Sequence, residues 1–175
     1  MEFFESVLEF NHFTKAEFTD NYDSQEQLFT DLITFFDSIV PDNAQVTLEF
    51  AKNKDLEIFH VIIDSSKSYN WNVELNSKKC DSLCEKLGWR NGELEIINSK
   101  LTAIDCISIN NGNKYTIGYK RDGMGIYYYN IHPADLTEAE IANCSGCISI
   151  FHRKNIVLEY GSGATGSLCF PERFR

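Results

Sequence analysis

The sequence predicts an α+β fold, a single domain in which four to five helices pack against a mainly antiparallel or mixed sheet. The 175-residue chain is 43% hydrophobic and 24% charged and has only 3 Pro, which is the composition of one packed domain. Segments with alternating apolar residues come in pairs, as hairpins do, and helical patterns separate the pairs. No connection has the length that a parallel crossover needs, so neighbouring strands should run antiparallel.

The strongest helical pattern runs from Ser24 to about Val40. Its apolar residues fall on one arc of about 160° when they are placed at helical spacing. Ser24 and Gln27 have the spacing of a capping box, and Pro41 cannot continue the helix. A shorter helix is compatible with the Phe-rich segment 3–12 that precedes it.

After this helix the apolar period changes from near 3.6 to 2. Residues 46–50 and 56–63 are predicted to form a hairpin, and the second strand is apolar on both faces, as interior strands are. A further strand is expected over 69–75, followed by a short helix that ends at Gly88.

The second half of the chain contains a weak internal repeat. The sequence Cys-Ile-Ser-Ile occurs at 106–109 and again at 147–150, and each copy opens a predicted hairpin that follows a helical pattern. This arrangement predicts two helix-plus-hairpin units, 92–120 and 136–160, with a strand over 125–131 between them. Because the match is short, convergence on a common hairpin sequence remains as open as duplication.

Negative charge is concentrated in the first third of the predicted single domain, 1–175. Residues 1–64 hold 14 acidic and 3 basic side chains and 10 of the 13 Phe, whereas residues 65–175 hold 12 acidic and 13 basic side chains. The acidic, Phe-rich segment 1–64 must therefore bury its apolar side chains and turn its carboxylates outward. The candidate partner-binding residues are the carboxylates off the apolar arc or at the helix ends: Asp20, Asp23, Glu26, Asp31, Asp37 and Asp42.

The overall charge and the N-terminal sequence exclude several classes of partner. A net charge of −10 and a pI near 4.8 argue against nucleic acid and against anionic membranes, which both require basic residues. The N-terminal sequence lacks the basic start of a signal peptide, and no stretch approaches the ~18 apolar residues that span a bilayer. A cytoplasmic protein with reduced cysteines is expected.

The six cysteines offer few ways to form a functional site. Cys106, Cys147 and Cys169 lie in apolar strand patterns and are expected to be buried thiols. Four thiolates could hold zinc, but the first pair has helical spacing rather than a tight turn, so packing or inert thiols are favoured for all four: Cys80, Cys84, Cys144 and Cys147. The C-x-x-C sequence at Cys144 lacks the helix N-terminus that a redox dithiol needs.

The Gly-rich segment Gly161–Ser167 is the most distinctive short sequence. It matches neither the Walker A nor the Rossmann pattern, so a tight loop that leads into a C-terminal edge strand is favoured over a ligand-binding loop. Among the histidines, His60 is expected to be a hydrogen-bonded core residue, and His132 and His152 are expected to be exposed. A pairing of Cys147 with His132 as nucleophile and base has no local support.

These observations favour a small, acidic, bacterial binding protein that neutralises a basic protein. Its most specific form is an immunity protein that inhibits a cationic nuclease toxin. No catalytic residue, metal ligand or cofactor is predicted. The alternative is a small enzyme or ligand-binding domain that uses the Gly161–Ser167 loop with Cys147, Cys169 or His132, and a third interpretation is a purely structural domain.

Overall fold

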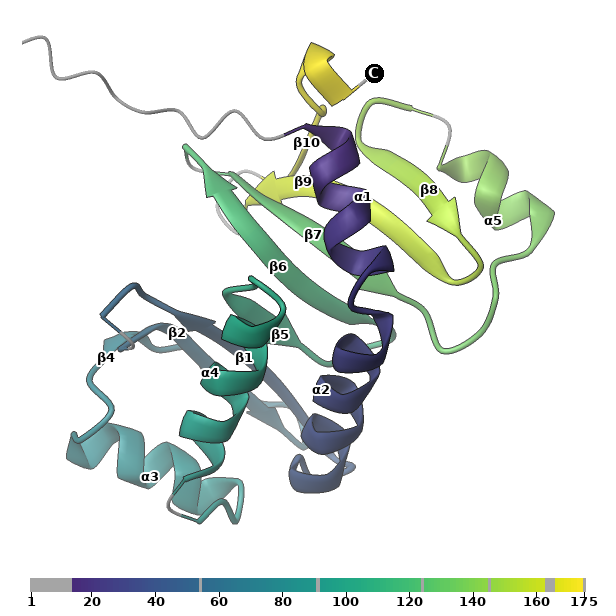
Figure 1. The fold of residues 1–175 in the computed structure, drawn as a ribbon. Helices are drawn as coiled ribbons and strands as arrows, with labels where there is room; N and C mark the ends of the chain where they lie inside the picture. The colour runs from purple at the N-terminus through teal and green to yellow at the C-terminus, as the bar shows by residue number, and fades with distance from the viewer. Residues whose placement is uncertain are drawn as a thin grey trace, which may run out of the picture.

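The computed structural model describes residues 14–53, 55–90, 92–123, 125–144, 146–162 and 166–174 (Figure 1). These residues form one ten-stranded sheet and five α-helices. The helices are α1 (Lys15–Asp23), α2 (Glu26–Ile39), α3 (Lys78–Lys86), α4 (Glu93–Ala103) and α5 (Glu138–Asn143). The strands are β1 (Ala44–Phe50), β2 (Leu56–Ile63), β3 (Ser66–Ser68), β4 (Trp71–Val73), β5 (Ser108–Asn110), β6 (Tyr115–Asp122), β7 (Gly125–Ile131), β8 (Ser149–Arg153), β9 (Ile156–Ser162) and β10 (Gly166–Leu168).

The strand order is β10-β9-β7-β6-β5-β1-β2-β3, with β4 also pairing with β2 and β8 also pairing with β9. Every pairing between described strands is antiparallel, so the α+β class is confirmed and the mixed alternative is not found. Short connections account for the antiparallel pairs of sequential strands, because only a long crossover can bring two such strands side by side in parallel. The β1–β5 and β7–β9 pairs join strands that are not sequential and are also antiparallel.

The N-terminal helical region differs from the prediction at its start. Thr14 caps α1 and forms a reciprocal capping box with Glu17. Ser24 ends α1, and its hydroxyl donates to the carbonyl of Asp20 (2.6 Å), so the predicted capping box of Ser24 with Gln27 is wrong. Helix α2 begins at Glu26 without a side-chain cap and ends before Pro41, as expected. The helix proposed for segment 3–12 lies outside the described residues.

One hydrophobic cluster lies between the sheet and the helices. In Figure 1, α1, α2 and α4 lie together on one face of the sheet. Phe18 of α1 is fully buried and stacks on Tyr119 of β6 with ring centroids 5.3 Å apart. At the other end of the cluster, Trp89 stacks on Phe59 of β2 (5.9 Å), and its indole donates to the carbonyl of Ile39. The buried side chains form a single continuous core across the described residues.

Two short strands share each edge position of the sheet. Along β2, strand β3 pairs with residues 61–63 and β4 with residues 56 and 58. Between them, Asn70 uses its side-chain amide and its backbone carbonyl to bond both backbone groups of Phe59. Along β9, β8 pairs with residues 156–159 and β10 with residues 160–162. Interrupted edges of this kind offer little backbone for pairing with another chain.

The predicted helix-plus-hairpin units are not confirmed as building blocks. Helix α4 does precede the β5–β6 hairpin, and α5 does precede the β8–β9 hairpin. All of these strands, however, join one large sheet in which β7 separates β6 from β9. Helix α5 has no buried residue, so it cannot contribute to the core as α4 does.

Candidate functional site

The six predicted carboxylates lie along α1 and α2 and at the start of β1. Asp20 and Asp23 belong to the last turn of α1, Glu26 to the first turn of α2, and Asp42 to the loop after α2. Five of the six are exposed and Glu26 is half-buried. Since a helix rises about 1.5 Å per residue, Glu26 and Asp37 are separated by about 16 Å along α2. The carboxylates therefore form an extended acidic surface, which we call the α1–α2 acidic surface, and not one compact cluster.

Two of these carboxylates contact the side chains of Arg153 and His152 on β8. Arg153 Nη2 donates to Glu26 Oε2 (3.0 Å), and Arg153 Nε makes a close ionic contact with Asp23 Oδ1 (2.9 Å). His152 Nε2 lies 2.7 Å from the same Asp23 oxygen. His152 is only half-buried and points to the helix, so its predicted exposed position is wrong. Sequence reasoning missed these contacts because more than 120 residues separate the partners.

The remaining carboxylates have no ion pair with a described residue. Asp37 accepts a hydrogen bond from the Tyr115 hydroxyl of β6, and Asp31 accepts one from Gln27 (2.9 Å). Asp20 and Asp37 lie in the last turns of their helices, which contain no basic residue. The negative end of the helix dipole disfavours both positions for a carboxylate.

The structure contradicts the roles considered for Cys147 and Cys169. The two cysteines form a disulfide that joins the segment before β8 to the segment after β10. They are therefore neither reduced nor buried, and Cys147 is neither a zinc ligand nor a nucleophile for His132. Cys144 lies at the end of α5, far across the molecule from Cys80 and Cys84 on α3 (Figure 1). The four-thiolate zinc site is wrong, and the described residues contain no cluster of three metal-ligating side chains.

The Gly-rich segment connects two paired strands. Gly161 of β9 pairs with Ser167 of β10, and an added Cβ would lie 2.9 Å from the carbonyl oxygen of Gly166, so close pairing requires glycine there. The expected C-terminal edge strand is confirmed as β10. Residues 163–165 of the loop lie outside the described residues. The described residues of this segment line neither the cavity between α3 and α4 nor the cavity beside His132.

Two histidines have environments that the sequence did not indicate. His60 is half-buried on the sheet face opposite the helices, where its ring centroid lies 4.9 Å from those of Tyr69 and Trp71. Its Nε2 has no hydrogen-bond partner among the described residues. Burial lowers its pKa. The prediction of a hydrogen-bonded core histidine is therefore wrong. His132 is also half-buried and lines a cavity of about 470 Å³ with Lys114, and burial and this lysine lower its pKa.

The sheet face opposite the helices carries a row of residues that sequence reasoning missed. The pairing register aligns one residue from each of five strands: Trp71, Ile58, Glu49, Ser108 and Gly118. Trp71 is 58% exposed, while Glu49 is 2% exposed because Arg121 covers it. The alternation of apolar and polar residues in β1 could have indicated which residues face away from the helices. In β2 the apolar residues on both faces hid this pattern.

The larger cavity, of about 670 Å³, lies between α3 and the start of α4. Cys80 and Cys84 line it from adjacent turns of α3, together with three carboxylates and the ring of Trp89. Interaction between the two thiols lowers the pKa of Cys80, and the same interaction together with burial raises the pKa of Cys84.

Comparison with known proteins finds no protein family, curated protein or solved structure that matches this chain. Among the described residues, no helix is long and apolar enough to cross a membrane. Any assignment of function must therefore be argued from the sites themselves.

Proposed function

We propose that this protein binds a basic protein through the α1–α2 acidic surface and thereby inhibits it. The most specific form of the proposal is an immunity protein that masks a cationic nuclease toxin. Complementary charge accelerates association and selects the partner, while apolar contacts near the centre of an interface supply much of the affinity. Both kinds of group are present on α2.

The observation that carries the proposal is that α1 and α2 each have an exposed carboxylate at the C-terminal end, where the helix dipole is negative. Asp20 and Asp37 each oppose the helix dipole, at a cost of about 0.3–1 kcal/mol at low salt. No described cation forms an ion pair with Asp20 or Asp37. The Tyr115 hydroxyl partly compensates Asp37, whereas no described side chain compensates Asp20. A residue that opposes stability without compensation is expected at a functional position.

An exposed leucine lies within the same surface. Leu28 is 43% exposed on α2, three residues before Asp31, and residues with this spacing are neighbours on a helix surface. Asp23 and Glu26 contribute less free charge than the others, because Arg153 already binds both. We therefore place the centre of the interface on the part of α2 that contains Leu28 and Asp31.

The proposal is tested with two double variants that change the net charge equally. Asp31→Lys with Asp42→Lys reverses charge on the α1–α2 acidic surface. Glu74→Lys with Glu85→Lys reverses two exposed carboxylates near α3 and serves as the control. Proteins captured by the wild type from its cells of origin are identified, and the association rate of each purified candidate is measured by surface plasmon resonance at low and physiological salt.

The expected partner has more Lys and Arg than Asp and Glu, and the protein suppresses its nuclease activity. The α1–α2 double variant should associate roughly 10-fold more slowly at low salt, while the control double variant should retain the wild-type rate. The absence of any basic protein among those captured, or an equal loss of rate in both double variants, would rule out this binding mode.

A further inference from the structure

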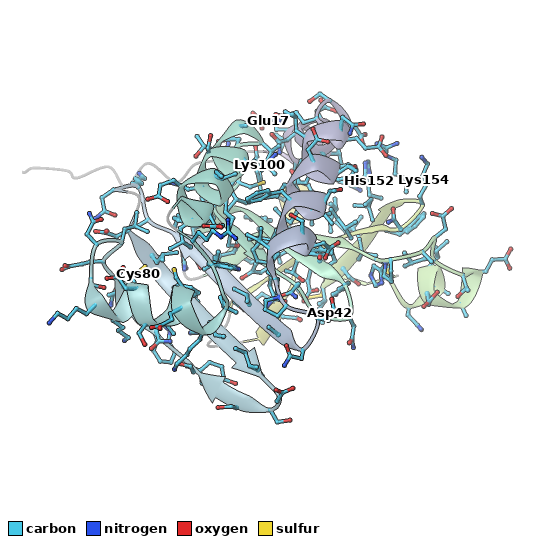
Figure 2. The ribbon with its side chains drawn as sticks, turned by 90° about the horizontal axis from the view of Figure 1, so that it is seen from below. Glu17, Asp42, Cys80, Lys100, His152 and Lys154 are labelled. Carbon is cyan, nitrogen blue, oxygen red and sulfur yellow. A yellow bond between two sulfur atoms is a disulfide. The ribbon has the colours of Figure 1, made fainter. Side chains whose placement is uncertain are left out.

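An exposed aromatic cluster lies on the sheet face opposite the helices. Trp71 of β4 is 58% exposed and Tyr69 is 49% exposed, and their ring centroids lie 6.4 Å apart. The ring of His60 stands nearly perpendicular to both, at 77° and 80°. This contact restricts the two rings before a ligand arrives, which lowers the entropy cost of binding. The helices lie on the other side of the sheet, where Glu17 marks α1 and Lys100 marks α4 in Figure 2.

The cavity of about 470 Å³ beside His132 opens on the same face as this cluster. Three of its lining residues alternate along β1, β5 and β6 with fully buried core residues, and therefore point away from the helices: Gln45, Asn110 and Thr116. The register pairs His60 with Thr47, and Thr47 with Asn110. Since neighbouring strands lie about 4.8 Å apart, the backbone of Asn110 is about 10 Å from that of His60.

The cluster and the cavity therefore form one continuous surface, which we call the aromatic–amide surface. It comprises these residues: Tyr69, Trp71, His60, Thr47, Gln45, Asn110, Asn113, Lys114 and Thr116. Its strands β2, β1 and β5 are interior strands, whose backbone groups are already paired on both sides. A peptide cannot add to them as a further strand, so only side chains are available to a ligand.

The side chains of this surface suit a ligand that has apolar ring faces and many hydroxyl groups. Gln45, Asn110 and Asn113 supply three amides to the cavity, and each amide carries donors and an acceptor, as hydroxyl groups do. Trp71 and Tyr69 present flat rings whose faces are electron-rich and attract weakly positive C–H groups. A sugar ring offers C–H groups on its faces and hydroxyl groups around its edge.

The charges on this face are balanced, which restricts the ligand further. Six charged side chains belong to it, by register or by contact with a residue of the face: Lys67, Lys114, Arg121, Glu49, Glu57 and Glu159. Three are basic and three are acidic, and all except Lys67 belong to an ion pair. A cation or an anion gains little attraction here, so a neutral ligand is favoured.

We propose that the aromatic–amide surface binds a neutral oligosaccharide. One sugar ring stacks on Trp71 and Tyr69, and the hydroxyl groups of a ring further along the ligand hydrogen-bond to Gln45, Asn110 and Asn113. No covalent bond forms or breaks. This surface lies on the opposite face of the sheet from the α1–α2 acidic surface, so either proposal can fail without the other.

The test uses four neutral probes: cellohexaose, xylohexaose, maltohexaose and chitohexaose. Anionic hexagalacturonate and a proline-rich peptide, which also packs on aromatic rings, represent other classes of ligand. Calorimetry should show that at least one neutral probe binds more tightly than either of these two. As this probe covers the exposed Trp71, the Trp fluorescence of the wild type should move to shorter wavelength, whereas the buried Trp89 contributes no change.

Two variants test the two parts of the surface. Trp71→Ala should weaken binding of the neutral probe at least ~10-fold and abolish the spectral shift, because it removes the stacking ring. Gln45→Ala should weaken binding roughly 5-fold, the value of one hydrogen bond. The matched control is Ile96→Ala, which removes another exposed apolar side chain, on α4, and should bind as the wild type does.

Circular dichroism verifies that each variant is folded; the exposed positions of Trp71 and Gln45 limit damage from their substitution. The proposal would be overturned if none of the four neutral probes binds, or if hexagalacturonate or the peptide binds more tightly than all of them. Unchanged affinity in either surface variant, or an equal loss of affinity in Ile96→Ala, would also overturn it.

Discussion

At the scale of single residues, Glu49 shows how far a side chain's environment can depart from its sequence context. It occupies a polar position in the alternating pattern of β1 and faces away from the helices, yet it is 2% exposed. Arg121, far along the chain on β6, binds Glu49 with its guanidinium and also reaches Glu57. Burial raises the pKa of Glu49, although Arg121 opposes the shift.

We expect Arg121→Ala to destabilise the protein by about 1–3 kcal/mol, because it leaves a buried carboxylate without its partner. The side chain of Arg121 is itself 40% exposed, which limits the cost. Without the guanidinium, the pKa of Glu49 should rise further. When the pKa of a carboxyl group is higher in the folded state than in the unfolded state, the protein loses stability as the pH rises above the unfolded-state pKa. Urea unfolding should therefore show a larger loss at pH 8 than at pH 5.

The control is the double variant Arg121→Ala with Glu49→Gln. A neutral amide needs no counter-charge, so the double variant should recover part of the lost free energy and should lose the pH dependence. If the single variant is equally stable at both pH values, the ion pair does not control the protonation of Glu49.

At the scale of elements, α1 and α2 show which local signals are reliable. The apolar arc of α2 and its end before Pro41 were predicted correctly. The capping box assigned to Ser24 was wrong, because Ser24 instead closes α1 through the carbonyl of Asp20. The true box, Thr14 with Glu17, has the same spacing and was overlooked beside the Phe-rich segment. Short capping patterns recur by chance, whereas an apolar arc over four turns does not.

We expect Asp20→Lys to stabilise the protein by about 0.3–1 kcal/mol at low salt, because a cation replaces an anion at the C-terminal end of α1. Urea unfolding measures this change. Asp31→Lys, which makes the same change of charge in the middle of α2, controls for the lower net charge and should have a smaller effect. A destabilised Asp20→Lys variant would mean that Asp20 stabilises the fold, which would remove the main support for a binding role.

At the scale of the whole molecule, the disulfide joins elements that the chain order keeps apart. Cys147 and Cys169 are 22 residues apart and connect the two strands that share one edge of the sheet. Directly after Cys169, Phe170 and Phe174 pack into the core, where Phe174 stacks on Tyr127 at 5.0 Å. The disulfide therefore holds the C-terminal segment against the aromatic region of the core.

We expect Cys147→Ser with Cys169→Ser to lower the free energy of unfolding by roughly 3 kcal/mol, the loop-closure value for this separation. Hydrogen exchange should increase most in β8 and β10. The wild type under reducing conditions should behave in the same way, and Cys144→Ser should not. An unchanged urea midpoint in the double variant would show that edge pairing alone holds these strands.

The sequence by itself determined the fold class, the main helix and most strands, because these depend on apolar periodicity within short windows. It also determined the concentration of carboxylates in residues 1–64. The cavity beside Cys80 and Cys84 escaped it, as did the disulfide and the binding of Asp23 and Glu26 by Arg153. The tertiary structure decided these features. The contacts of Arg153 and the disulfide join residues that are separated in the chain, and the cavity depends on how α3 lies beside the start of α4. No local pattern encodes the strand order β9-β7-β6-β5-β1, which places these elements in space.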